Sequence, residues 1–335
     1  MKKTLGVLAL LLLVACDRGT GDRGKVYLPQ FSLPYGQSKV LIYSYPDLEY
    51  LGEVESGTLG MHARMRPGSD ELWVSCEGSR EIYVIDTESD ALRKRIPLGL
   101  AAQGGAFTPD GSIFVVAHGA QIAKRKGSDQ ASIVDAALQE ILVTLDVGEN
   151  PLDVAISPDG REAYVANNDG HTITRIDIVE RVVVDTMETG PGPYSLTVDP
   201  IKNVLLAACR GVDESSPGMV YWHQLPSLKW ISKYHSEMHP VQAFLNSEES
   251  LLVESATEAG GQIQVFADLD ADPELLMQFN EKPSLGQLSP SGRWLLITLG
   301  ADELVCIDME SKQICERRSL PDGSRGFFVM DLELD

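Results

Sequence analysis

Histidine, cysteine and aspartate side chains recur at two fixed positions of an internal repeat, and these residue types could bind a ligand, hold a metal ion or transfer protons. The first position lies five residues before a recurrent turn proline. In successive copies it holds His62, Gly104, Asp153, Ser195, Gln242 and Leu285, with Arg325 expected in the last copy. The second position, at the end of the following strand, holds Cys76, His118, Asn167, Cys209, Ser255 and Leu299. Both sets are predicted to face one rim of the folded chain.

These residue types support two kinds of chemistry. Asp153 paired with His62 or His118 could act as general acid and base in lactone hydrolysis. Imidazole and thiolate ligands together could bind zinc or copper. Both sets are chemically mixed, however, and no two members show the spacing of metal ligands on one helix or hairpin. The sequence therefore predicts no metal ion and no cofactor, and exposed loop histidines are the simpler explanation.

The signatures of common catalytic sites are missing from the chain. It contains no Gly-x-Ser-x-Gly elbow, no Cys-x-x-Cys-His haem attachment, no His-Glu-x-x-His pair and no phosphate-binding glycine loop. We therefore predict no catalytic residue and expect a binding or scaffold module for a protein partner or small ligand. Its predicted rim residues are His62, His118, Asp153, Asn167, His171, Arg210, His239 and Gln242. A lactonase-like hydrolase and a metal or redox accessory protein remain alternatives.

A long insertion at residues 118–132 carries a basic cluster, Lys124, Arg125 and Lys126, in an otherwise acidic protein. This loop could dock an anionic group or the acidic face of a protein partner. A solvated loop is the alternative explanation for three adjacent charges.

Two further cysteines indicate a structural disulfide and not a ligand-binding or metal site. Cys306 and Cys315 flank a turn centred between Glu310 and Ser311, so they are predicted to be direct cross-strand neighbours. Facing positions of an antiparallel pair bring Cβ atoms to about 4.5–5.5 Å, and export would permit a disulfide. Two reduced, buried thiols are the alternative.

The elements that must position these residues come from the repeat itself. Turn prolines at positions 67, 109, 158 and 200 are 42, 49 and 42 residues apart, and six copies align on this turn. Each copy holds four short runs of β-branched and apolar residues between Gly, Asp and Pro turns. In the third copy these runs are "DVAIS", "EAYVA", "TITRID" and "VVVDTM". Between them, the Asp-Gly pair at 159 and 160 supplies the positive φ of a tight hairpin, and the Asp of the Ile-Asp pair at 176 and 177 can bond its own backbone in the next turn. A four-stranded unit at this period is typical of a β-propeller blade.

Six copies leave two complementary fragments at the ends of the chain. The segment "SRGFFVMDLELD" resembles a first strand alone, whereas residues 25–57 supply second, third and fourth strands. Joined, they would close the ring and remove its exposed sheet edges. The predicted fold class is thus all-β, a seven-bladed β-propeller of four-stranded antiparallel blades whose last blade is shared by both termini. The rim of its central channel is the usual ligand site of such a ring.

The stretch from 149 to 200, with Tyr164-Val165-Ala166-Asn167 near its centre, is similar to the YVTN family of bacterial β-propeller repeats. The resemblance covers residues 25–335 and is sharpest in that stretch. It implies the propeller fold. Relatives of the fold include lactonase-like enzymes, surface-layer proteins and parts of periplasmic redox proteins, so it implies no single activity.

Residues 1–16 have the features of a bacterial lipoprotein signal. Two lysines precede an apolar run that is too short to span a bilayer. The run ends in Leu13-Val14-Ala15-Cys16, which resembles a lipobox, in which the cysteine is acylated and becomes the first residue of the mature chain. Two or three acyl chains, at about 0.8 kcal/mol per buried methylene, anchor a domain stably. The membrane is therefore an expected partner, through Cys16.

The segment after this signal is expected to be a short linker. Residues 17–24 read as a flexible tether, and residues 25–335 as one domain in the periplasm or at the cell exterior. Asp17 resembles the signal that retains lipoproteins in the inner membrane. An inner-membrane location is therefore slightly favoured.

The charge balance limits the possible partners. The chain has 49 acidic and 28 basic residues and a net charge of −21. Such a surface repels phosphate backbones, so no nucleic acid is expected as a partner. We expect a monomer.

Overall fold

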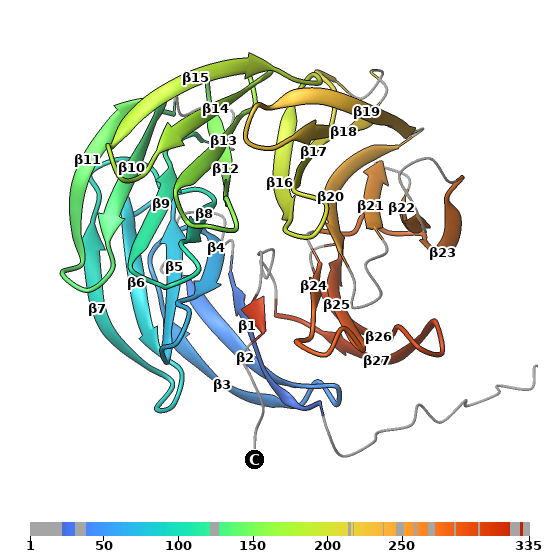
Figure 1. Cartoon of the computed structure of the whole chain (residues 1–335). Helices are drawn as coiled ribbons and strands as arrows, with labels where there is room; N and C mark the ends of the chain where they lie inside the picture. Colours follow the sequence, from blue (N-terminus) through green and yellow to red (C-terminus); the bar gives the residue numbers. More distant parts are fainter. Residues whose placement is uncertain are drawn as a thin grey trace, which may run out of the picture.

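The chain folds into seven four-stranded antiparallel sheets arranged in a ring, as a computed structural model shows (Figure 1). The structure describes residues 22–30, 38–120, 127–213, 216, 218–236, 238–245, 251–257, 260–266, 272–284, 286–300, 302–321 and 329–330. These residues form strands and turns, with no helix among them. The predicted seven-bladed β-propeller is confirmed.

We number the blades 1 to 7 around the ring. Blade 1 contains β4 (Gly60–Met65), β5 (Glu71–Cys76), β6 (Glu81–Asp86) and β7 (Ala91–Pro97). Blade 2 contains β8 (Gly105–Phe107), β9 (Ile113–Ala117), β10 (Gln130–Asp135) and β11 (Glu140–Asp146). Blade 3 contains β12 (Pro151–Ile156), β13 (Glu162–Asn167), β14 (Thr172–Asp177) and β15 (Val182–Glu188).

The second half of the ring repeats this order. Blade 4 contains β16 (Pro193–Asp199), β17 (Val204–Cys209), β18 (Gly218–Gln224) and β19 (Lys229–Ser236). Blade 5 contains β20 (His239–Leu245), β21 (Leu251–Thr257), β22 (Gly260–Phe266) and β23 (Glu274–Phe279). Blade 6 contains β24 (Gln287–Leu288), β25 (Trp294–Leu299), β26 (Glu303–Asp308) and β27 (Gln313–Ser319). Blade 7 contains β28 (Val329–Met330), β1 (Gly24–Pro29), β2 (Lys39–Tyr45) and β3 (Tyr50–Glu55).

The hydrophobic core lies between neighbouring blades. Successive side chains of a strand point to opposite faces, so Leu72 and Val74 of β5 pack on blade 7, whereas Trp73 packs on blade 2. The Trp73 ring meets the Phe107 and Phe114 rings at centroid distances of 5.1 and 5.3 Å. Each blade therefore needs a neighbour on both sides to bury its two apolar faces.

Two kinds of turn join the strands at one end of the ring. In the β12–β13 turn, Gly160 adopts a φ of +72°, and Asp159 Oδ1 accepts a hydrogen bond from the Arg161 N–H at 3.1 Å. In the β14–β15 turn, Asp177 Oδ1 accepts from the N–H groups of Val179 and Glu180, at 2.9 and 2.8 Å. The roles predicted for the Asp-Gly and Ile-Asp pairs are confirmed. We call this end of the ring the turn end.

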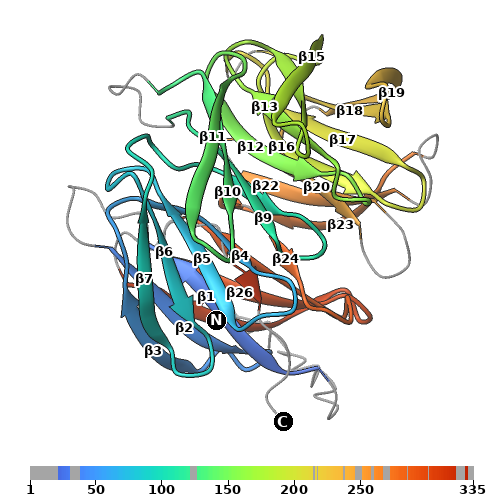
Figure 2. The same ribbon diagram turned by 60° about the vertical axis from the view of Figure 1, so that its left-hand side comes forward.

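The two ends of the chain close the ring in blade 7 (Figure 2). Val26 and Tyr27 of β1 pair with Met330 and Val329 of β28. The C-terminal segment thus supplies the first strand, and residues after 22 supply the other three, as the complementary fragments predicted.

The folded structure begins earlier than expected. Residues 22–24 were predicted to belong to the tether, but β1 starts at Gly24. The Asp22 carboxylate accepts a hydrogen bond from the Ser289 hydroxyl at 2.6 Å, and its carbonyl accepts from Trp294 Nε1 at 3.1 Å. Hydrogen bonds from blade 6 therefore hold Asp22 in place, two residues before β1 begins.

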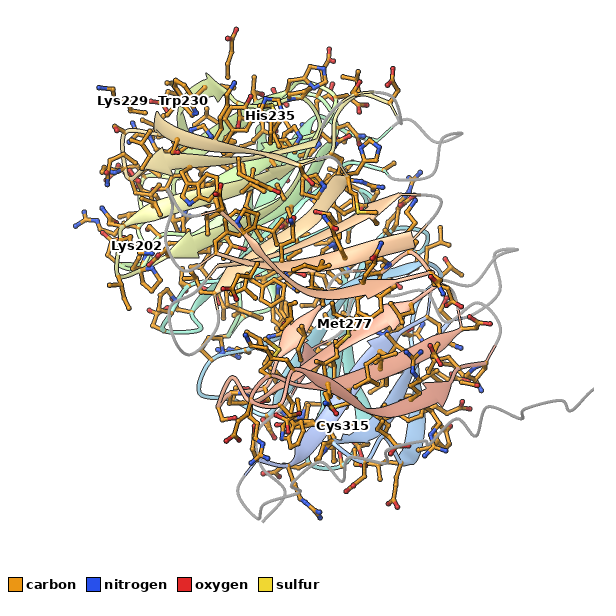
Figure 3. The ribbon with its side chains drawn as sticks, turned by 90° about the vertical axis from the view of Figure 1, so that its right-hand side faces the viewer. Lys202, Lys229, Trp230, His235, Met277 and Cys315 are labelled. Atoms are coloured by element: carbon orange, nitrogen blue, oxygen red, sulfur yellow. The ribbon has the colours of Figure 1, made fainter. Side chains whose placement is uncertain are left out.

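The predicted disulfide between Cys306 and Cys315 is not formed. Cys306 is a free, buried thiol. The turn has the expected register as far as the Ile307–Ile314 pair, but a β-bulge follows, and Cys306 then pairs with Glu316. Cys315, on the outer strand β27 (Figure 3), is the extra residue of this bulge. Such a bulge interrupts the third and fourth strands of all seven blades.

No helix among the described residues has the length and apolar character needed to span a bilayer.

Candidate functional site

The first strands of the blades surround the axis of the ring (Figure 1), and β12 contacts β8 on one side and β16 on the other. Near the start of β12, Asp153 Oδ2 accepts a hydrogen bond at 2.9 Å from the N–H of Leu196 in the next blade. Gln242 repeats this contact in blade 5, because its Oε1 accepts from the N–H of Gly286 at 2.9 Å. The predicted rim position therefore links one blade to the next.

Gly104 makes room for the Asp153 carboxylate. A Cβ on Gly104 would lie 2.4 Å from Asp153 Oδ1 and 2.7 Å from the carbonyl oxygen of Leu152. Any larger residue at this position would displace the carboxylate or the backbone. The equivalent position in blade 2 is thus a glycine because Asp153 of blade 3 occupies the space of its side chain.

Arg64 of β4, which the sequence analysis did not select, shifts the pKa values of two predicted rim residues. Burial raises the pKa of the Asp153 carboxyl, and the Arg64 guanidinium opposes part of that rise, as do backbone N–H groups. Burial lowers the pKa of His62 well below its usual range, and the charge of Arg64 lowers it further. Alternation along the strand could have identified Arg64, because it lies two residues after His62 and so on the same face.

Two buried polar atoms near the starts of β12 and β16 have no hydrogen-bond partner among the described residues. They are Asp153 Oδ1 and Ser195 Oγ. Asp153 is 3% exposed and Ser195 is 4% exposed, and Ser195 directly precedes Leu196, whose N–H binds Asp153. Leaving such an atom unpaired costs about 1–3 kcal/mol, so it calls for a functional explanation or a water molecule. We call His62, Arg64, Asp153 and Ser195 the axial polar group.

His118, at the end of β9, is held inside blade 2. Its Nδ1 lies 2.7 Å from the Ala101 carbonyl, which can only accept, so Nδ1 carries the proton. Its Nε2 lies 2.7 Å from Ser132 Oγ, which in turn lies 2.8 Å from Thr144 Oγ1. Burial lowers the pKa of His118 to about 4. The imidazole is therefore neutral at pH 7, with both nitrogens occupied.

The other members of the second-strand set are also turned into their blades. Asn167 donates from Nδ2 to the hydroxyls of Thr172 and Thr174, at 3.0 and 2.9 Å, and accepts at Oδ1 from the Gly148 N–H at 3.1 Å. Cys76 and Cys209 are fully buried, and burial raises the pKa of each thiol to about 12. These thiols stay protonated at neutral pH, a poor state for binding a metal ion.

Three further predicted rim residues join neighbouring blades. His171 Nδ1 accepts from the N–H of Gly192 at 3.1 Å, across blades 3 and 4. His239 Nδ1 donates to the carbonyl of Arg210, across blades 4 and 5. The Arg210 guanidinium lies 4.6 Å from the centroid of the Tyr194 ring. These residues lie at the end of the ring opposite the turn end, His171 and Arg210 in loops and His239 at the start of β20.

Several selected residues lie outside the described part of the chain. They are Cys16, Lys124, Arg125, Lys126, Leu285 and Arg325. Within the described residues, no group of three or more His, Cys, Asp or Glu side chains lies close enough to hold a metal ion.

Known proteins resemble this chain in fold. No protein-family model matches it, and no curated protein matches it. A functionally unknown protein from Desulfotomaculum acetoxidans DSM 771 is similar in structure, with a TM-score of 0.73, 14% identity and coverage of 92% of this chain and 98% of the other. Hydrazine synthase of Kuenenia stuttgartiensis is similar with a TM-score of 0.66 and 19% identity, over 75% of this chain and 77% of the other. At these identities the likeness shows the fold alone.

Proposed function

We propose that this protein is a lipid-anchored, extracytoplasmic propeller that binds a small polar ligand or a polar segment of a protein partner at the axial polar group, without catalysis. The observation that carries this proposal is the pair of buried atoms without a partner among the described residues, Asp153 Oδ1 and Ser195 Oγ. The anchor on Cys16 and the location outside the cytoplasm rest on the sequence, namely the lipobox and the likeness of residues 149–200 to YVTN repeats.

The axial polar group offers three kinds of contact. Arg64 supplies a permanent positive charge for a carboxylate or another anion. Ser195 can donate or accept a hydrogen bond. Asp153 accepts when ionised, and its raised pKa also favours a protonated form that donates. A ligand with one anionic group and adjacent hydrogen-bonding groups fits this set.

The state of the histidines supports binding over acid–base catalysis. A general base works best when its pKa lies near the working pH. His118 has a pKa of about 4 and both nitrogens in hydrogen bonds, and the pKa of His62 lies well below its usual range. Neither imidazole is poised to take a proton at neutral pH.

Native mass spectrometry of the protein, isolated from its own membranes in mild detergent, tests the binding site. We expect a mass above that of the denatured chain, and we expect D153N and S195A to lose this extra mass. D169N is the matched control, because Asp169 is an exposed residue of the β13–β14 loop. A wild-type protein with no extra mass would contradict tight binding, and turnover of simple lactones lost in D153N would favour the hydrolase.

The anchor has its own test. Mass spectrometry of the mature N-terminal peptide should find acyl chains on Cys16, and C16S should release the protein from membranes. A mature chain that keeps residues 1–15, or lacks acylation, would contradict the proposed anchor.

A further inference from the structure

Blade 4 differs in charge from the rest of the chain. Residues 193–236, which contain this blade, hold four Lys or Arg and three Asp or Glu, a balance of 4 − 3 = +1, whereas the whole chain has a net charge of −21. Of these acids, Asp199 is buried and accepts hydrogen bonds from the N–H groups of Ile201 and Lys202 in its own turn. Asp213 belongs to the β17–β18 loop, away from the turn end.

Large apolar side chains are exposed on the same blade. Trp230 is 52% exposed, Ile231 is 44% exposed and Ile201 is 66% exposed. The other three tryptophans, Trp73, Trp222 and Trp294, are 0%, 0% and 1% exposed. Trp230 follows the β18–β19 turn directly and Ile201 lies in the β16–β17 turn, so both lie at the turn end. Trp230 is thus the one exposed tryptophan of the four, and exposed apolar patches rimmed by polar residues mark interaction sites.

Three lysines lie on the same blade as this tryptophan. Lys229 precedes Trp230 on the outer strand β19, and Lys233 Nζ lies 5.9 Å from the centroid of the Trp230 ring, whereas Lys202 lies apart from them in the β16–β17 turn (Figure 3). None of the three lysines forms an ion pair with another residue that the structure describes. We define the blade 4 edge as Ile201, Lys202, Lys229, Trp230, Ile231 and Lys233.

The chain enters the ring at the same end. Asp22 bonds to the hydroxyls of Ser289 and Ser291 and to Trp294 Nε1, at the β24–β25 turn of blade 6. Cys16 lies six residues before Asp22. Six residues reach at most about 20 Å. If Cys16 carries the lipid, as the proposed function holds, the turn end faces the membrane at short range.

We propose that the blade 4 edge contacts the anionic phospholipid surface of the membrane that holds the Cys16 lipid. Tryptophan prefers the level of the lipid headgroups, and lysines near the surface are attracted by anionic lipids. Isoleucine side chains add apolar area at the same depth. In this orientation the axial polar group, at the start of the first strands, faces away from the membrane. The anchor and the edge thus hold the propeller with its binding rim outward.

Fluorescence of the acylated, full-length mature protein in vesicles tests this contact. The vesicles contain phosphatidylcholine, phosphatidylglycerol and a brominated phosphatidylcholine that quenches tryptophan at headgroup depth. We expect quenching in the wild type and its loss in W230F, because the remaining tryptophans are buried. K229Q should weaken binding of the C16S protein to these vesicles about fivefold, since one lysine near the surface contributes about 1 kcal/mol. K94Q, on the outer strand β7 of blade 1, is the matched control and should leave binding unchanged.

The outcomes separate this inference from the anchor. An acylated protein whose quenching is the same in wild type and W230F would overturn the membrane contact and leave the anchor intact. A wild-type protein that is isolated from its own membranes without acylation, and that still binds anionic vesicles through Trp230, would support the edge and contradict the anchor. Shielding of Trp230 from aqueous iodide in the native membranes, combined with no quenching by the brominated lipid in vesicles, would mean that a protein covers the edge, and would overturn the proposal.

Discussion

Acidification should destabilise the protein through His118. Its pKa is about 4 in the folded chain and near 6.5 when unfolded. Between these values the unfolded state binds the extra proton, so stability is full above pH 6.5 and falls as the pH drops towards 4. The loss from this residue is about 3 kcal/mol at the lower limit. Urea unfolding from pH 7 to pH 4.5 should show a steeper decline for the wild type than for H118Q.

In the comparison with H118Q, the contributions of the other titrating groups to the pH dependence of stability cancel. Burial also lowers the pKa values of His62 and His223 and raises that of Asp153, but both proteins contain these residues. Equal pH slopes in the two proteins would contradict a buried, neutral His118.

His118 also shows how far single residues could be predicted from the sequence. The repeat predicted its position at the end of a second strand. Its hydrogen bonds could not be predicted, because they depend on Ser132 and Thr144, which lie on β10 and β11. The effect of Arg64 on Asp153 was also missed, because it arises between blades 1 and 3. The residue types follow from the sequence, whereas their partners are set by the folded ring.

At the scale of the strand and turn, the repeat predicted the four strands of blade 3 and the turn roles of Gly160 and Asp177. It could not predict the β-bulges. A β-bulge depends on how two paired strands align with each other, and the residue pattern of a single strand does not determine that alignment. Cys306 and Cys315 illustrate the result, because the register was right for two pairs and then shifted by one residue.

The bulge predicts how Cys306 reacts. A thiol reagent applied to the native protein should leave Cys306 unlabelled, since the thiol is buried and burial raises its pKa. Unfolding in urea without any reductant should then allow its labelling, which peptide mass spectrometry can detect. Labelling that requires a reductant would mean that Cys306 is in a disulfide.

The aspartate of the β14–β15 turn should contribute measurably to stability. D177A removes the acceptor of two backbone N–H groups, and we expect the free energy of unfolding to fall by about 1–2 kcal/mol. D169A changes the same residue type in the exposed β13–β14 loop of the same blade, and its effect should stay within about 0.5 kcal/mol. Similar effects from both variants in urea unfolding would argue against the turn contact.

At the scale of the whole molecule, the sequence predicted the blade number well because closure constrains it. Six copies and two complementary fragments admit one ring without open edges. Even the fifth copy, in which a serine replaces the turn proline, forms the four strands β20–β23. Its neighbours supply an apolar surface on each side, as Ala243 packs on blade 4 and Phe244 on blade 6.

Removing the C-terminal strand should open the ring. A chain that ends at Met330 keeps both pairs between β28 and β1, whereas one that ends at residue 328 has neither. We expect the shorter chain to lose on the order of 2 kcal/mol or more, and to self-associate through the exposed edge of β1. Thermal unfolding and sedimentation of the two chains check this. Equal melting temperatures and a monomeric shorter chain would contradict closure by β28.

The pairing of β1 with β28 also determines when the protein can be completed. A growing chain emerges with β1 before blades 1 to 6, but the partner of β1, at residues 329 and 330, emerges after them. Blades 1 to 6 can form in order as their residues appear, whereas blade 7 must wait for residues 329 and 330. A chain that is exported during its synthesis would therefore begin to cross the membrane before its ring can close.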